Sequence, residues 1–398
     1  MIFLLGLDRA NYPMALRWVR YAEAVAAHAD DPLDLRRAWR LGHRAGIHSK
    51  LGESAQAQAL HEVSIAIHER ALGPDHPDVA TGLQNLGNHH GSIGAYAEAR
   101  RLLERALEIR ERALGPDHPG VILILASLAS AHRGLGDHAK ARALQELALA
   151  STERALGPDH PTVAGRLNDL AGTLSATGES IAALAMQERA LAITEKAVGP
   201  DHPDVAARLS NLAGILLDMR ETTRARPLFE RGMAIWEKAL GPDHPNVAVS
   251  LKNLGDIARV DGDLPRGRAL YERSLAIREK KLGADNPKVA LVLAKLASLE
   301  LEEKRPAEAL ALCERAFKIY DANEGLLAGE IDAHFSRAQA LLATGGDRTR
   351  ALADAEFARD ETRKLGPGKL EALAELEAWI TKQITQQITQ QNAGQSGE

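Results

Sequence analysis

The chain has 398 residues, a formal net charge of −5 at pH 7 and only 4% aromatic residues. Its Lys and Arg residues are dispersed, which argues against nucleic-acid phosphates or an anionic membrane surface as partners. The single cysteine, Cys313, excludes disulfides within the chain and is compatible with the cytoplasmic location that we expect. The opening MIFLLGLDRA is too short an apolar run for a signal peptide or a membrane span.

One six-residue phrase, LGPDHP, recurs along the chain at steps of 42 residues. A strict period of this length is typical of repeat arrays, in which each unit packs on its neighbours. The sequence therefore predicts one extended array in place of two or three separate domains. The copies and their near-copies are Leu72–Pro77, Leu114–Pro119, Leu156–Pro161, Val198–Pro203, Leu240–Pro245 and Leu282–Pro287.

Each residue of this phrase has an expected role in linking two helices. Gly73 ends one helix and Pro74 prevents its continuation. Pro77 opens the next helix, where its missing N–H costs nothing. A residue before proline avoids helical angles, so we expect His76 to be the N-cap residue and Asp75 to accept free N–H groups of the helix start.

The 36 residues between successive phrases read as two helices. In the first, Val79, Leu83, Leu86 and Gly87 fall at i, i+4, i+7 and i+8, which is one helical stripe. In the second, small residues such as Ala99 and Ala106 recur seven apart and allow close helix approach.

A glycine separates the two helices in most copies, where positive φ is expected just past a helix end. The glycine column holds Gly94, Gly136, Gly178 and Gly262. Arg220 and Lys304 replace it in two copies, and for those we expect looser or differently capped turns.

The paired helices, the turn glycine and the small–Leu–small pattern resemble tetratricopeptide repeats (TPRs). The 42-residue step and the linkers resemble the kinesin-light-chain type. This resemblance implies an all-α, right-handed superhelical solenoid of about eight helix-turn-helix repeats. The first helices that carry it read LQNLGN (83–88), LNDLAG (167–172), LSNLAG (209–214) and LKNLGD (251–256).

The ends of the array depart from the repeat pattern, as terminal repeats must because one apolar face would otherwise be exposed. We expect an N-terminal capping helix region at 1–31, with the helix itself near 11–28. The array then covers 32–364, with its best-matching copies in 73–322. A C-terminal capping helix at 365–386 and a disordered tail at 387–398 complete the prediction.

The sequence contains no pattern that indicates catalysis, a cofactor or a metal. Packed helices lie ~8–10 Å apart, whereas zinc ligands lie ~2.0–2.1 Å from one ion, so neighbouring copies of the repeated histidine cannot share a metal. The remaining histidines show neither HExxH order nor a nearby Cys pair. We therefore expect a protein that is not an enzyme.

The resemblance further implies that the first helices line a concave groove that binds extended peptides. Amide side chains there can donate to and accept from a peptide backbone. Polar residues are also ordinary on an exposed helix face, so the alternative that these positions have no binding role stays open. The candidate groove residues are Gln84, Asn85, Asn88, Arg133, Asn168, Asp169, Asn211, Lys252, Asn253, Asp256 and Arg259.

Two functions fit these observations. The first is a non-catalytic interaction scaffold that binds a peptide or partner protein in an extended conformation. The alternative is a sensor or regulatory arm of a larger signalling ATPase whose nucleotide-binding domain lies outside this chain.

Overall fold

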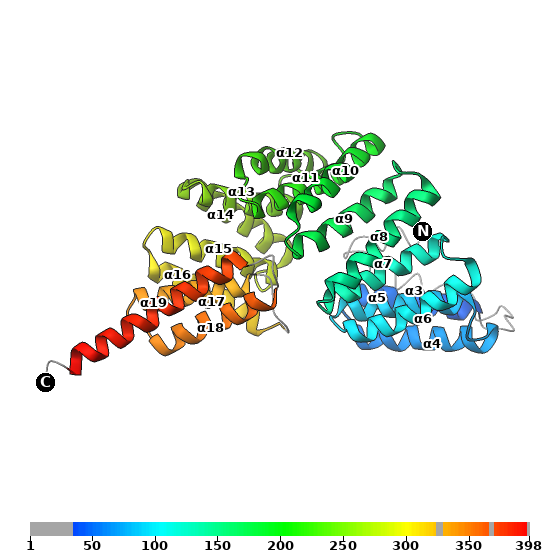
Figure 1. Cartoon of the computed structure of the whole chain (residues 1–398), viewed down its shortest axis with the longest axis horizontal. Coiled ribbons are helices and arrows are strands. Elements are labelled where there is room, and N and C mark those ends of the chain that lie inside the picture. The colour runs from blue at the N-terminus through cyan, green and yellow to red at the C-terminus, as the bar shows by residue number, and fades with distance from the viewer. Residues whose placement is uncertain (1–34, 324–328, 366–369, 396–398) are drawn as a thin grey trace. The chain divides into compact units, whose positions relative to one another are not determined.

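The computed structural model describes residues 35–323, 329–365 and 370–395. These residues form 17 α-helices and no strand (Figure 1). The helices are α3 Leu35–Leu51, α4 Ser54–Leu72, α5 Pro77–Ser92, α6 Tyr96–Leu114, α7 Pro119–Gly134, α8 His138–Leu156, α9 Pro161–Ala176, α10 Ser180–Val198, α11 Pro203–Asp218, α12 Thr222–Leu240, α13 Pro245–Val260, α14 Leu264–Leu282, α15 Pro287–Glu302, α16 Pro306–Asp321, α17 Glu330–Ala343, α18 Arg348–Lys364 and α19 Leu370–Gln395.

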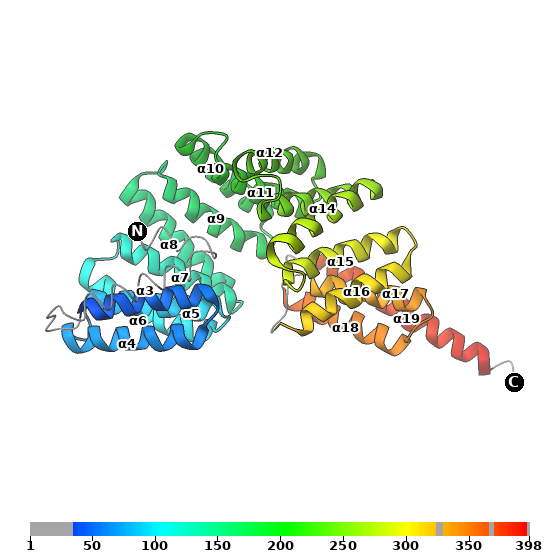
Figure 2. The ribbon, with the colours of Figure 1, turned by 180° about the vertical axis from the view of Figure 1, so that it is seen from behind.

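The chain divides into two compact units, residues 1–173 and 174–398, with the boundary inside α9. In the first unit α3 packs on α4, α5 on α6 and α7 on α8, and α4 and α6 also pack on the hairpin that follows. The second unit repeats this order from α11/α12 to α17/α18 (Figure 2). Within each unit neighbouring first helices contact each other, as α5 does α7 and α13 does α15. The predicted all-α array of helix pairs is confirmed.

The histidine of the repeated phrase is the N-cap of each first helix that follows it. The backbone of His76 is extended, with φ −75° and ψ 142°, and its Nδ1 accepts a hydrogen bond from the Asp78 N–H at 3.1 Å. Asn286 does the same with its side-chain oxygen at 3.0 Å from the Lys288 nitrogen. The N-cap prediction is confirmed, and the ring supplies the acceptor. The other copies are His118 (3.0 Å), His160 (3.2 Å), His202 (3.2 Å) and His244 (3.2 Å).

The aspartate of the phrase has a different role from the predicted one. Because the histidine ring already caps the helix, Asp75 reaches the second helix of the next hairpin, where it lies 3.6 Å from Arg112. Later copies repeat this pairing between Asp and a basic residue 37 positions on, so the linker is tied to the hairpin that it introduces. Those pairs are Asp117–Arg154 (2.7 Å), Asp201–Lys238 (3.0 Å) and Asp243–Lys280 (2.6 Å).

The turns without glycine keep the glycine geometry, so the expectation of looser or differently capped turns is wrong. Arg220 has φ 63° and Lys304 φ 60°, close to the 81° of Gly94. The N–H of Glu221 closes the turn on the Leu216 carbonyl at 2.8 Å. The packing of the two helices fixes the turn, and the non-glycine residues adopt the left-handed conformation that it requires.

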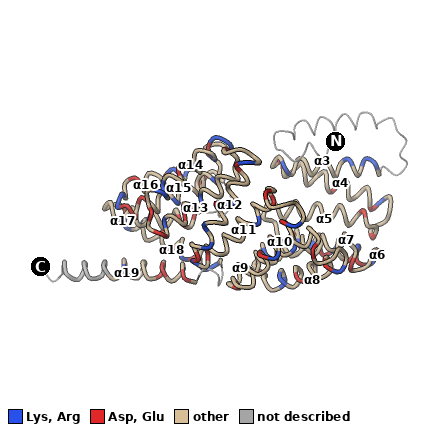
Figure 3. The backbone as a smooth tube through the Cα atoms, turned by 90° about the horizontal axis from the view of Figure 1, so that it is seen from above, with Lys and Arg blue, Asp and Glu red and all other residues tan. Residues whose placement is uncertain are grey.

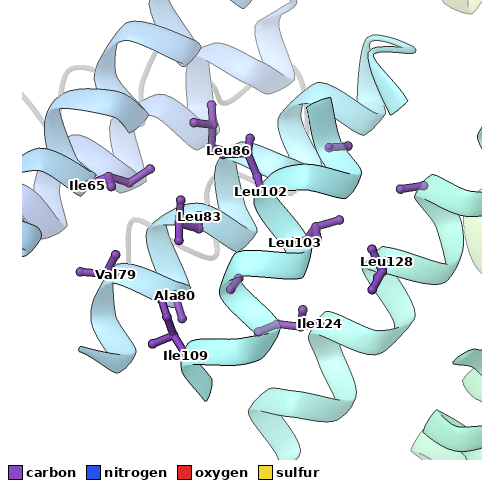
Figure 4. Packing of buried hydrophobic residues seen from close by; sticks show 13 residues of the cluster. Ile65, Val79, Ala80, Leu83, Leu86, Leu102, Leu103, Ile109, Ile124 and Leu128 are labelled. Atoms are coloured by element: carbon purple, nitrogen blue, oxygen red, sulfur yellow. The ribbon is translucent and has the colours of Figure 1, made fainter. Parts of the chain in front are cut away.

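The predicted apolar stripe forms the core. Figure 4 shows Val79, Leu83 and Leu86 of α5 directed toward residues of α4 and α6, and their exposed fractions are 0%, 2% and 5%. The small residues Ala99 and Ala106 are fully buried. A small residue on one helix faces a large one on the other, since a Cβ added at Gly87 would lie only 2.8 Å from the Leu103 side chain. Close helix approach therefore depends on small residues opposite larger ones.

The predicted ends are only partly covered by the structure. The N-terminal capping region at 1–31 lies outside the described residues. At the other end α19 begins at Leu370 and continues to Gln395, past position 387, where the tail was expected to begin. Leu376 and Ile380 of α19 are each 5% exposed, so this helix covers the last hairpin.

Three buried histidines form a cluster between α4 and α5. His61 and His89 are each 3% exposed and His90 is 8% exposed. The two nitrogens of His89 lie 2.8 Å from the Ser49 hydroxyl and 3.0 Å from the Ser54 hydroxyl. Burial, and secondarily the neighbouring imidazoles, lowers the pKa of His61 to about 4.

We predict that the cap histidines stabilise the array through their ring acceptor. His118→Ala should lower the free energy of unfolding by about 1 kcal/mol, because the Gly120 N–H loses its partner. His118→Asn should have little effect, since Asn286 performs the same role. Urea denaturation followed by circular dichroism measures both, and equal losses in the two variants would contradict the capping role.

Relief of backbone strain gives a second prediction. Lys304→Gly should stabilise the protein by about 0.5–1 kcal/mol, because a left-handed L-residue costs ~1–2 kcal/mol and the greater freedom of unfolded glycine offsets part of that gain. The reverse change Gly262→Lys, at φ 79° with no neighbouring atom within 4 Å, is the control. It should destabilise by a similar amount in thermal unfolding.

Acid should loosen the first unit. The folded state keeps His61 neutral down to about pH 4, whereas the unfolded chain takes up a proton near pH 6.5. Stability is therefore complete above pH 6.5 and falls below it, by about 2 kcal/mol at pH 5 from this residue. Amide exchange of α4 and α5 at pH 7 and pH 5 measures this. His61→Leu should reduce the dependence on pH, and an unchanged dependence would contradict it.

Candidate functional site

The first helices of the first unit share a groove. It has a volume of about 470 Å³ and lies along α5, α7 and α9, with part of α6. Three of the predicted residues, Gln84, Asn88 and Asp169, line it together. The other polar residues of its wall are Ser92, Ser127, Ser130 and Arg166.

Some of these polar groups already have partners within the protein. The Arg110 guanidinium donates to the Gln84 side-chain oxygen at 3.4 Å, and burial lowers the pKa of Arg110. Arg166 lies 3.4 Å from the Asp169 carboxylate. Asn88 and Ser130 are exposed and make no side-chain hydrogen bond in the described residues, so they can donate and accept toward a ligand.

The apolar part of the groove was missed by the sequence reasoning. Leu123 of α7 lines the groove with 50% of its surface exposed. Tyr96 belongs to the start of α6, and its ring packs against Gly134. A Cβ added at Gly134 would lie 2.4 Å from a carbon of that ring. Leu123 could have been noticed as a large apolar residue on the predicted polar face. The position of Tyr96 depends on a packing contact between hairpins, which no single helix pattern reveals.

The remaining predicted residues of the first unit lie outside this groove. Asn85 is exposed and lines a neighbouring cavity of about 930 Å³ that also contains Trp39, itself 65% exposed. Arg133 is exposed on α7, and its guanidinium lies close to Gly172 of α9. A Cβ added at Gly172 would lie 3.3 Å from a guanidinium nitrogen. Asn168 is half-buried on α9.

In the second unit the predicted charged residues belong to internal ion pairs. Lys252 donates to Asp256 at 2.8 Å, and the Tyr271 hydroxyl donates to the same carboxylate at 2.7 Å. Burial pushes the pKa of Asp256 upward, but Lys252, Lys295 and these hydrogen bonds outweigh it and hold the pKa below its ordinary value. Tyr271 fits there because a Cβ at position 255 would lie 2.6 Å from its ring, so Gly255 is required.

The other charges of this wall are also paired. Arg259 donates to Glu302, and Lys295 donates to Asp332 at 2.6 Å. These residues line a second groove of about 600 Å³. The two remaining predicted residues lie on the first helices, with Asn211 exposed on α11 and Asn253 half-buried on α13. Because positive and negative groups neutralise each other, this wall presents polar and mixed-charge surface.

The described residues contain no group of three or more His, Cys, Asp or Glu side chains placed to hold a metal ion. Nor does any described helix have the length and apolar character needed to cross a membrane. Lys and Arg are interspersed with Asp and Glu along most of the helices (Figure 3), whereas α3 contains five basic residues and no acidic one.

Comparison with known proteins supports the repeat assignment. A family model for the tetratricopeptide repeat matches residues 34–112, 83–154, 121–196, 166–221, 204–262 and 253–322. No curated protein matches the chain.

Among solved structures, the chain is similar to the apo form of RapI, with 15% identity, TM-score 0.57 and coverage of 87% of this chain and 98% of that one. It is also similar to BtubC (BKLC) from P. vanneervenii, with 24% identity, TM-score 0.50 and coverage of 59% and 96%. Kinesin light chain TPR-like repeats from Podosopora anserina match at 26% identity, TM-score 0.47 and coverage of 52% and 98%. The helix pairs, the repeated linker and the family match together show that this chain belongs to the tetratricopeptide repeat family.

Proposed function

We propose that the protein is a non-catalytic scaffold that binds an extended peptide segment of a partner protein along the first helices. The observation that carries this proposal is the groove of the first unit, which combines exposed amide and hydroxyl groups with the exposed side chain of Leu123. Asn88 and Ser130 can bond to a peptide backbone of any sequence, and Leu123 offers a contact for one apolar side chain.

The charge pattern favours a peptide without a dense cluster of one sign. Arg166 and Asp169 neutralise each other at one end of the groove. A ligand with several adjacent phosphates or carboxylates would find no cluster of free Lys and Arg there. The chemical class that fits is a mixed polar and apolar segment in an extended conformation, which exposes its backbone groups to the groove wall.

The groove predicts a specific binding defect. A partner captured with the intact chain should bind the Asn88→Ala, Ser130→Ala double variant roughly 5- to 150-fold more weakly in calorimetry, since each lost hydrogen bond contributes ~0.5–1.5 kcal/mol. Folding should be unchanged, because both side chains are exposed.

The matched control changes the opposite side of the hairpins. Glu104 and Glu146 lie on the second helices α6 and α8, paired with Arg100 and Arg142 at i, i+4 spacing. Replacing both glutamates by alanine should leave affinity unchanged. Loss of binding in this control, with full affinity in the groove variant, would move the site to the second helices.

A further inference from the structure

The first half of α19 carries an acidic and aromatic stripe. Glu371, Glu375 and Trp379 recur every fourth residue and so lie on one side of the helix. A different side holds α19 on the last hairpin, where Ile380 packs in a cluster with Leu341 and other residues of α17 and α18. The neighbouring Trp379 packs against the same cluster, whereas Glu371 and Glu375 are exposed and available for contacts beyond that hairpin.

Those contacts reach the turn between α11 and α12. The Arg220 guanidinium lies 3.4 Å from the Glu371 carboxylate and 3.9 Å from that of Glu375. Three hairpins, from α13 to α18, lie between this turn and α19 in the sequence. The helix thus joins the end of the second unit to a turn near its beginning.

The groove of the second unit lies under this helix. Its walls are formed by residues of α13, α15 and α17, such as Arg259, Lys295 and Phe335, and by Glu375 and Trp379 of α19. The rings of Trp379 and Phe335 meet edge to face, with centroids 5.4 Å apart and an interplanar angle of 86°. In Figure 1, α19 runs across α15 and α17, in agreement with these contacts.

The backbone of Arg220 has the left-handed conformation found at this turn in the other repeats. Its φ of 63° falls in the left-handed region, at a position where five other repeats have glycine. Glycine would form this turn without strain. Lys304 has the same conformation, so the backbone alone does not indicate a role for the side chain, and the evidence for a role of Arg220 is its contact with Glu371 and Glu375 of α19.

We propose that the first half of α19 is a strap that closes the groove of the second unit, and that loss of the Arg220 contacts with Glu371 and Glu375 opens it. The inference rests on the proposed function, since it concerns access to a first-helix groove. All three side chains are more than half exposed, so solvent and salt weaken their attraction and the closure is reversible. A partner segment with acidic residues four apart on a helix would compete with α19 for Arg220.

A thiol in the groove reports on opening. Gln339 of α17 lines the groove and is half-buried, so Gln339→Cys places a reactive group under α19. The native Cys313 gives no background signal, because it is fully buried and burial raises the pKa of its thiol to about 12. An uncharged maleimide avoids any direct effect of the charge changes on the reagent.

In this background, Arg220→Glu should raise the maleimide reaction rate at position 339 and amide exchange in residues 370–379 by roughly two- to fivefold. Combining it with Glu371→Lys and Glu375→Lys should restore slow reaction and slow exchange. Lys304→Glu is the matched control, because Lys304 has the same left-handed backbone and makes no ion pair in the described residues. It should leave both rates unchanged.

Equal rates in the Arg220→Glu and Lys304→Glu variants would overturn the proposal. Fast exchange that persists in the triple charge-exchange variant would also overturn it, because the lost ion pairs would then not be the cause. Neither measurement needs a ligand. Failure of the strap therefore leaves the partner-binding test in the first unit unaffected, and the two proposals can fail separately.

Discussion

The linker between hairpins is the constraint on which the rest of the structure depends. A glycine with positive φ ends each second helix from α4 to α14, and the first helix that follows begins four residues later, after a side-chain N-cap. Because the histidine ring bonds to the second N–H after it, the chain direction at the start of the helix is fixed. Because the same linker is repeated every 42 residues, each hairpin packs on its neighbour within a unit in a similar way.

Packing within and between hairpins decides which groups reach the grooves. Gly255 leaves room for the Tyr271 ring, and the Tyr271 hydroxyl then bonds to Asp256 on the groove wall. In the same way Gly134 leaves room for Tyr96 at the groove of the first unit. A small residue on one helix and a large residue on another are thus a single structural feature, and replacing either would alter both the core and the groove.

The two grooves differ in how much of their polarity is already satisfied. In the first unit, exposed side chains such as Asn88 remain available to a ligand. In the second unit, Lys252, Arg259 and Lys295 each pair with a carboxylate, and Glu375 and Trp379 of α19 line the same groove as Arg259 and Lys295. A charge that is paired must lose its partner before it can bind a ligand, which is unfavourable in a partly buried site. The same repeat therefore provides one groove with free polar groups and one groove whose charges are already paired.

The sequence alone determined the array of helix pairs, the helix-capping histidine and the buried stripe, because these features depend on local backbone preference and on helical periodicity. It also placed Gln84, Asn88 and Asp169 on one face, where the structure brings them together. Only tertiary structure decided the rest. The position of Tyr96 and the reach of α19 to α11/α12 depend on contacts between residues far apart in the chain, and the pattern of a single helix does not reveal such contacts.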